Sequence, residues 1–71
     1  MSNYTMLVER DVDSGWLVGE VAELPGCYTQ APDWARLETN MREAIGAWLA
    51  DHEGYVAESE FVGAVRLEAA P

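Results

Sequence analysis

A single stripe of apolar residues marks one predicted helix. A helix with one such stripe can pack against one neighbouring layer, such as one face of a sheet. Asp33 is a good N-cap residue before the stripe, and His52 and Gly54 are typical of a helix C-terminus after it. We therefore predict a helix from residue 34 to about residue 52, with both of its tryptophans in the core. The apolar side chains recur at three- and four-residue intervals, at Trp34, Leu37, Met41, Ala44, Ile45, Trp48 and Leu49.

Three predicted strands precede this helix, and one follows it. Residues 4–10, 16–21 and 27–30 are rich in apolar and β-branched residues, and turn-forming residues separate them. Gly15 ends the first turn, where we expect a positive φ, and Pro25-Gly26 predicts a type II turn before the third strand. The last predicted strand, residues 60–67, alternates, with Phe61, Gly63, Val65 and Leu67 on one face and Val62, Ala64 and Arg66 on the other.

The predicted order of elements is β-β-β-α-β, which gives an α+β fold in a single domain that spans residues 1–71. One helix can cover one face of a four-stranded sheet, so we expect a two-layer domain, with no C-terminal DNA-binding module. The far face of the sheet receives no second layer from this chain, and Leu7 and Val18 fall on it. Apolar residues on an uncovered face indicate that this face or a sheet edge meets another protein.

The chain has 71 residues and one cysteine, Cys27. A chain of this length buries only ~60% of the surface that it exposes when unfolded. Small domains usually add a disulfide, a metal or an oligomeric interface to a thin core, and one cysteine cannot form an internal disulfide. We therefore expect a homo-oligomer, either a dimer or a tetramer.

The charge balance is strongly acidic, with 13 Asp and Glu against four Arg and no Lys, for a net charge of −9. Such a chain repels a phosphate backbone, so we expect no direct binding to nucleic acid. The charge favours a basic protein partner through complementary potentials, although it also serves simply to keep a small protein dissolved. There is neither a signal-peptide pattern nor an apolar run of ~20 residues, which predicts a cytoplasmic protein without a membrane span.

No group of residues predicts an active site or a metal site. Asp11-Val12-Asp13-Ser14-Gly15 begins like a calcium-binding loop, but its glycine comes one position early and Ala22 stands where the closing glutamate belongs. The side chains of Asp51-His52-Glu53 point in three directions from a helix. Cys27 has no histidine at a motif spacing to activate it. We therefore predict a protein that is not an enzyme and holds no cofactor.

The candidate partner contacts lie beside the predicted turns. Acidic side chains around the first hairpin can meet a basic partner, although solvated loop charges are an equally good explanation for each of them. Aromatic rings on short strands beside turns are often exposed for use in an interface. The candidates are Asp11, Asp13, Trp16, Glu20, Glu23 and Tyr28.

A set of motifs runs from residue 4 to residue 49. The most specific is Glu23-Leu24-Pro25-Gly26-Cys27, which Thr29-Gln30 follows. The others are the strand Tyr4-Thr5-Met6-Leu7-Val8-Glu9, the aromatic Trp16, and Asn40 and Glu43-Ala44-Ile45 in the helix. Together they resemble the HicB family of bacterial and archaeal antitoxins. Where members of that family usually have Gly-Asp-Thr, this chain has Ala31-Pro32-Asp33, so it resembles a divergent member.

The resemblance implies a partial ribonuclease H-like fold without the nuclease carboxylates. HicB proteins neutralise HicA toxins, which are small basic enzymes that cleave messenger RNA, by covering their active sites. The expected function is therefore that of an antitoxin that binds and inhibits a basic HicA-like toxin. The alternative is an orphan oligomeric scaffold, or a small-ligand-binding domain of the same fold, with no toxin partner.

Overall fold

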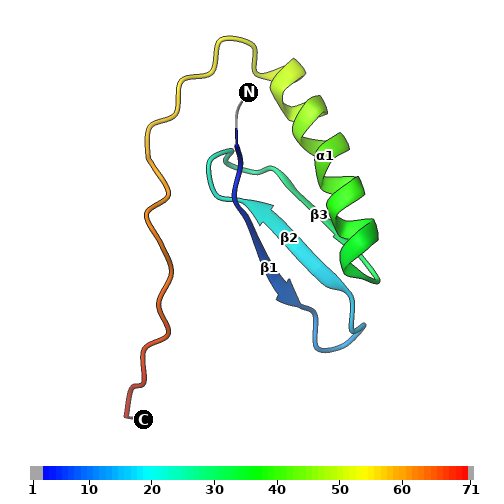
Figure 1. Ribbon diagram of the computed structural model, residues 1–71, viewed down its shortest axis with the longest axis vertical. Coiled ribbons are helices and arrows are strands. Elements are labelled where there is room, and N and C mark those ends of the chain that lie inside the picture. Colours follow the sequence, from blue (N-terminus) through cyan, green and yellow to red (C-terminus); the bar gives the residue numbers. More distant parts are fainter. Residues whose placement is uncertain (1–2, 71) are drawn as a thin grey trace.

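Three strands form an antiparallel sheet and one helix lies across it in the computed structural model, which describes residues 3–70 (Figure 1). The strands are β1 (Met6–Arg10), β2 (Leu17–Val21) and β3 (Tyr28–Ala31), in the spatial order β1-β2-β3. The helix is α1 (Trp34–Asp51), with Asp33 as its N-cap and His52 as its C-cap. These bounds confirm the predicted helix, and the first three predicted strands lie within two residues of the strands found.

Both predicted turns form, and each has a glycine with positive φ. Gly15 has a φ of 78° at the end of the β1–β2 turn. Gly26 has a φ of 81° in the β2–β3 turn, where the Cys27 N–H donates a hydrogen bond to the Leu24 carbonyl at 3.1 Å. A side chain at either glycine would strain the backbone, so these glycines fix the paths by which the chain enters β2 and β3.

One face of the sheet packs against α1 and forms the core. Alternate strand residues point to this face. Leu17 and Val21 of β2 and Ala31 of β3 are buried there, together with Leu37 and Met41 of the helix. Burial of a Leu, Val or Met side chain stabilises a fold by about 1.5–3 kcal/mol, so these few contacts hold the two layers together.

Gly19 lies at the centre of β2, where two methionines close over it. A Cβ atom at this position would lie 2.8 Å from Met6 Sδ and 3.3 Å from Met41 Cε. Because the shorter distance is below van der Waals contact, a larger residue would have to push the methionines aside. The close packing of Met6 and Met41 therefore accounts for a glycine in the interior of a strand.

The two tryptophans of α1 differ from each other, and the prediction that both pack in the core is wrong for one. Trp48 is half-buried against the core, and its Nε1–H donates a hydrogen bond to the Pro25 carbonyl at 3.0 Å. Trp34 is 55% exposed, because it opens the first turn and the first helical residue buried against the sheet is Leu37. The apolar stripe alone does not show where along the helix the sheet begins.

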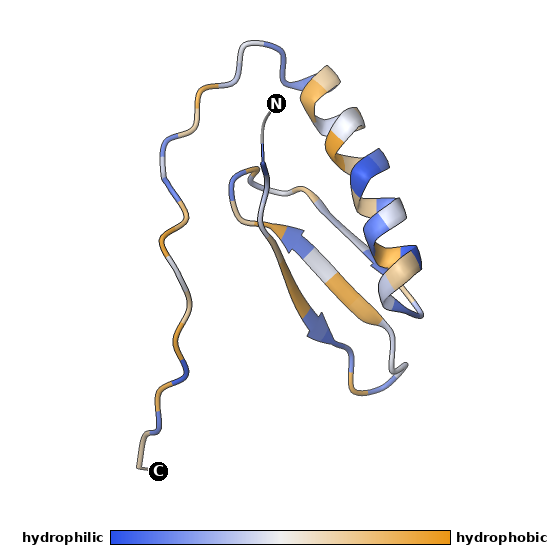
Figure 2. Ribbon diagram, in the orientation of Figure 1, coloured by the Kyte–Doolittle hydropathy of each residue, from blue (hydrophilic) through white to orange (hydrophobic). Residues whose placement is uncertain are grey.

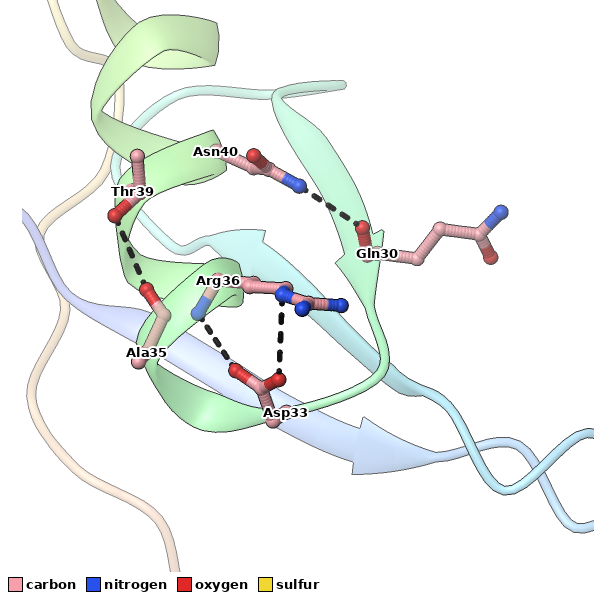
Figure 3. Close-up of polar contacts among 6 residues, drawn as sticks. All are labelled: Gln30, Asp33, Ala35, Arg36, Thr39 and Asn40. Atoms are coloured by element: carbon pink, nitrogen blue, oxygen red, sulfur yellow. Dashed lines mark hydrogen bonds and ion pairs between the residues drawn. The ribbon is translucent and has the colours of Figure 1, made fainter.

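Polar contacts fix where α1 begins and how it lies on the sheet (Figure 3). At its N-terminus, Asp33 Oδ1 accepts a hydrogen bond from the Arg36 N–H at 2.8 Å, and Arg36 Nε lies 3.6 Å from Asp33 Oδ2. Further along, the Asn40 amide nitrogen donates to the Gln30 carbonyl of β3 at 3.4 Å. Together with the bond from Trp48, this contact ties the helix to the sheet layer at two points.

The predicted fourth strand is wrong for the single chain. Residues 60–67 form no strand, and residues 56–70, which we call the tail, run separately from the sheet on its β1 side (Figure 1). Alternating apolar residues favour a strand, but a strand also needs an edge with which to form hydrogen bonds. After the turn that follows α1, in which Gly54 has a φ of 84°, the tail crosses to the β1 side of the sheet but does not pair with β1 (Figure 1).

Replacing Asp33 with Ala is expected to lower the free energy of unfolding by about 1 kcal/mol, because the Arg36 N–H loses its acceptor. Denaturation by urea, followed by tryptophan fluorescence, measures the change. Asp33→Asn is the matched control, since it keeps an acceptor oxygen and removes only the charge. Equal losses in the two variants would show that the charge, and not the capping hydrogen bond, stabilises the helix.

Candidate partner-binding face

The face of the sheet opposite α1 is uncovered, and side chains from all three strands form a groove on it. We call this surface the open face. It encloses a volume of about 530 Å³. Leu7 is 43% exposed and Tyr28 is 68% exposed, so apolar surface is available for contact. The residues of the open face are Leu7, Glu9, Val18, Glu20 and Tyr28.

The strand register brings these five residues together. Leu7 is opposite Glu20, and Glu20 is opposite Tyr28, which makes one row across the sheet. Glu9 is opposite Val18 in the next row. Residues two apart on a strand share a face, so the two rows lie side by side. Each carboxylate therefore has an apolar side chain directly across from it.

The two carboxylates of the open face are not neutralised within residues 3–70, where the ion pair found joins Arg36 to Asp33 at the start of α1. Two unpaired carboxylates in one groove attract a cationic group. A lysine or arginine side chain fits this arrangement chemically, because its aliphatic stem packs on apolar surface while its charged head meets a carboxylate. The open face can therefore receive basic side chains from a protein partner.

The structure brings together two of the six predicted contact residues. Glu20 and Tyr28 lie on the open face as partners across β2 and β3. The other four lie at the two ends of β2. They are Asp11, Asp13 and Trp16 between β1 and β2, and Glu23 between β2 and β3.

Asp11 and Glu23 also hold local structure. The Ser14 hydroxyl donates to Asp11 Oδ2 at 2.6 Å, and this bond, with a weaker contribution from the Ser14 N–H, lowers the pKa of Asp11. The Thr5 N–H donates to Glu23 Oε1 at 2.6 Å and lowers the pKa of Glu23. That second bond joins the β2–β3 loop to the start of β1, so both carboxylates have structural roles.

Sequence reasoning did not single out Leu7, Glu9 and Val18 as contacts. The sequence does predict that Leu7 and Val18 lie on the face of the sheet away from the helix. The structure confirms this, because both residues lie on the open face. The first hairpin could have predicted these contacts, because the position of its turn sets which residues of β1 and β2 lie opposite each other. That register pairs Glu9 with Val18 and Leu7 with Glu20.

The remaining candidate chemistry is limited. Burial raises the pKa of the Cys27 thiol, which keeps the thiol protonated at neutral pH. Within residues 3–70, no cluster of three His, Cys, Asp or Glu side chains is placed to hold a metal ion. No helix in the same range is long and apolar enough to cross a membrane.

Comparison with known proteins finds relatives that match most of the chain. A UPF0150 protein of Archaeoglobus fulgidus is 35% identical over 65 residues, which cover 92% of this chain and 91% of the relative. A UPF0150 protein of Synechocystis is 40% identical over 60 residues, or 84% of each chain. A third, from Thermoplasma acidophilum, is 39% identical over 46 residues, or 65% of each chain. No family model matches, and no solved structure matches at a significant level.

The bond from Thr5 to Glu23 predicts a pH dependence of stability. The folded-state pKa of Glu23 lies below the ordinary value of 4.5, so its stabilisation is complete above that value and is lost as the pH falls through the folded-state pKa. Glu23→Gln is expected to be less stable at neutral pH and to lose less stability on acidification. Urea denaturation at a series of pH values measures both effects.

The control for this experiment is Glu43→Gln, which removes an exposed carboxylate from α1. This variant should keep the wild-type dependence of stability on pH. If Glu23→Gln and the wild type lose stability in parallel on acidification, Glu23 does not contribute to the pH dependence.

Proposed function

The chain belongs to the UPF0150 family, and we propose that this member acts as an antitoxin-like inhibitor, which binds a small basic mRNA-cleaving toxin of the HicA type. The observation that carries the proposal is the open face, with its two unpaired carboxylates beside exposed apolar side chains. The motifs that resemble HicB antitoxins, such as residues 23–27, support the choice of partner. A partial ribonuclease H-like fold, with this sheet as its core, is part of the same proposal.

Charge supports a basic partner over a neutral or acidic one. The chain has a net charge of −9, and Glu9 and Glu20 place part of it on the open face. Complementary potentials speed the encounter between an acidic and a basic protein and disfavour partners of the wrong charge. An enzyme that cleaves RNA must bind phosphates with basic side chains, and the carboxylates of the open face can occupy those side chains instead.

Apolar area supports a protein partner over a free ion. Tyr28 is 68% exposed and Leu7 is 43% exposed, and each lies in the same cross-strand row as Glu20. Exposed aromatic residues are frequent anchors of protein interfaces, since they bury much area at small entropic cost. Tyr28 is therefore the proposed anchor, Glu20 is the proposed charged contact beside it, and Glu9 is the proposed charged contact on β1.

The direct test is binding to the protein encoded next to this chain's gene, where that protein is short and basic. The double variant Glu9→Gln, Glu20→Gln is expected to weaken the complex by about tenfold or more, mainly through slower association. Its matched control is the double variant Glu43→Gln, Asp51→Asn, which removes the same charge from exposed positions on α1. Surface plasmon resonance measures the association and dissociation rates of each.

A second readout links binding to inhibition. Co-expression of the wild-type chain should restore growth of cells that express the basic protein, and the open-face double variant should restore it less well than the control. The complex should weaken as salt is raised from about 50 to 500 mM, because salt screens the attraction. Equal binding by the two double variants would exclude the open face, and a harmless neighbour that forms no complex would exclude the antitoxin role.

A further inference from the structure

Glu20 and Tyr28 form a close cross-strand pair on the open face. The Val21 N–H donates a hydrogen bond to the Cys27 carbonyl at 2.9 Å, which makes these two residues a hydrogen-bonded pair at the turn between β2 and β3. Hydrogen-bonded and non-hydrogen-bonded pairs alternate along an antiparallel ladder, and side chains lie closer together in the second kind. The next pair, Glu20 and Tyr28, is therefore non-hydrogen-bonded, so its two side chains lie close together on the open face.

The neighbouring row of the open face has a carboxylate without an aromatic ring across from it. Glu9 lies opposite Val18, and Val18 lies opposite Gln30 of β3. Figure 2 shows the hydrophilic end of β1 beside the hydrophobic start of β2, and the hydrophilic end of β2 beside the hydrophobic part of β1. Each row therefore has one carboxylate and apolar surface, and the ring of Tyr28 distinguishes the two rows.

A carboxylate beside an exposed ring favours one of the two long basic side chains of proteins. The guanidinium group of arginine is planar, can donate two parallel hydrogen bonds to one carboxylate, and stacks on an aromatic face. The ammonium group of lysine is a compact and more strongly hydrated charge, which gains less from a ring that is in contact with water. Tyr28 is 68% exposed, so its ring is available for stacking.

We propose that Glu20 and Tyr28 form an arginine-binding site, in which Glu20 accepts hydrogen bonds from a guanidinium group while the Tyr28 ring stacks on it. Leu7, which lies opposite Glu20 on the other side, packs against the aliphatic stem. Glu9 binds a second basic side chain and accepts arginine and lysine alike. This inference rests on the proposed function for the identity of the partner, and it adds that the partner's residue at Glu20 is an arginine.

The arginines of the chain leave this site to another molecule. Arg10 Nη1 donates a hydrogen bond to the Gly15 carbonyl at 2.7 Å, and Arg36 Nε lies 3.6 Å from Asp33 Oδ2. Within residues 3–70, no arginine forms an ion pair with Glu20. The carboxylate of Glu20 is therefore available to an arginine from a partner.

The test uses two tripeptides with blocked ends, glycine-arginine-glycine and glycine-lysine-glycine, each titrated into the full chain labelled with nitrogen-15. The arginine peptide is expected to bind with a Kd about threefold to fivefold lower, because stacking adds to charge pairing. Changes in the amide NMR signals should centre on Glu20 and Tyr28. Equal Kd values for the two peptides would overturn the proposal, as would changes confined to the Asp11–Ser14 turn.

Matched variants separate the ring from the carboxylate. Tyr28→Leu should bring the two Kd values within about 1.5-fold of each other, whereas Tyr28→Phe keeps the ring and should keep the preference. Glu20→Gln should raise the Kd of the arginine peptide about threefold. Glu9→Gln should leave the preference unchanged. An unchanged preference in Tyr28→Leu, or a lost one in Tyr28→Phe, would show that stacking on the ring does not select arginine.

The titration contains no toxin, so the two proposals fail separately. A preference for the arginine peptide without a complex between this chain and a basic neighbour would discard the antitoxin role and support the arginine site. A complex that restores growth, together with equal Kd values for the two peptides, would support the antitoxin role and overturn the arginine site.

Discussion

The packing of α1 on one face of the sheet is the contact on which the rest of this structure depends. Leu37 and Met41 bury themselves against β2 and β3, and the bonds from Asn40 and Trp48 hold the helix in place over them. Because a helix has one apolar stripe, it covers one face and leaves the other to solvent. The open face is a consequence of having a single helix for a three-stranded sheet.

The most specific motif in the sequence, residues 23–27, lies in the β2–β3 loop, and its residues stabilise the fold. Glu23 accepts the Thr5 N–H, Gly26 supplies a positive φ, and Leu24 and Cys27 are buried. Each of these residues therefore has a structural reason to be present in a protein with this loop. Residues 23–27 therefore have direct structural roles, and the proposed contacts with a partner lie on the strands, at Glu9, Glu20 and Tyr28.

Local signals in the sequence predict local structure well in this chain. The helix, its Asp33 cap and both glycine turns follow from residue preferences that act over a few positions, and the structure has them where they were predicted. The exposure of Trp34 and the position of residues 60–67 depend on where the sheet ends and which edge is free, which no local preference encodes. The open face is an intermediate case, because its residues become neighbours only through the strand register.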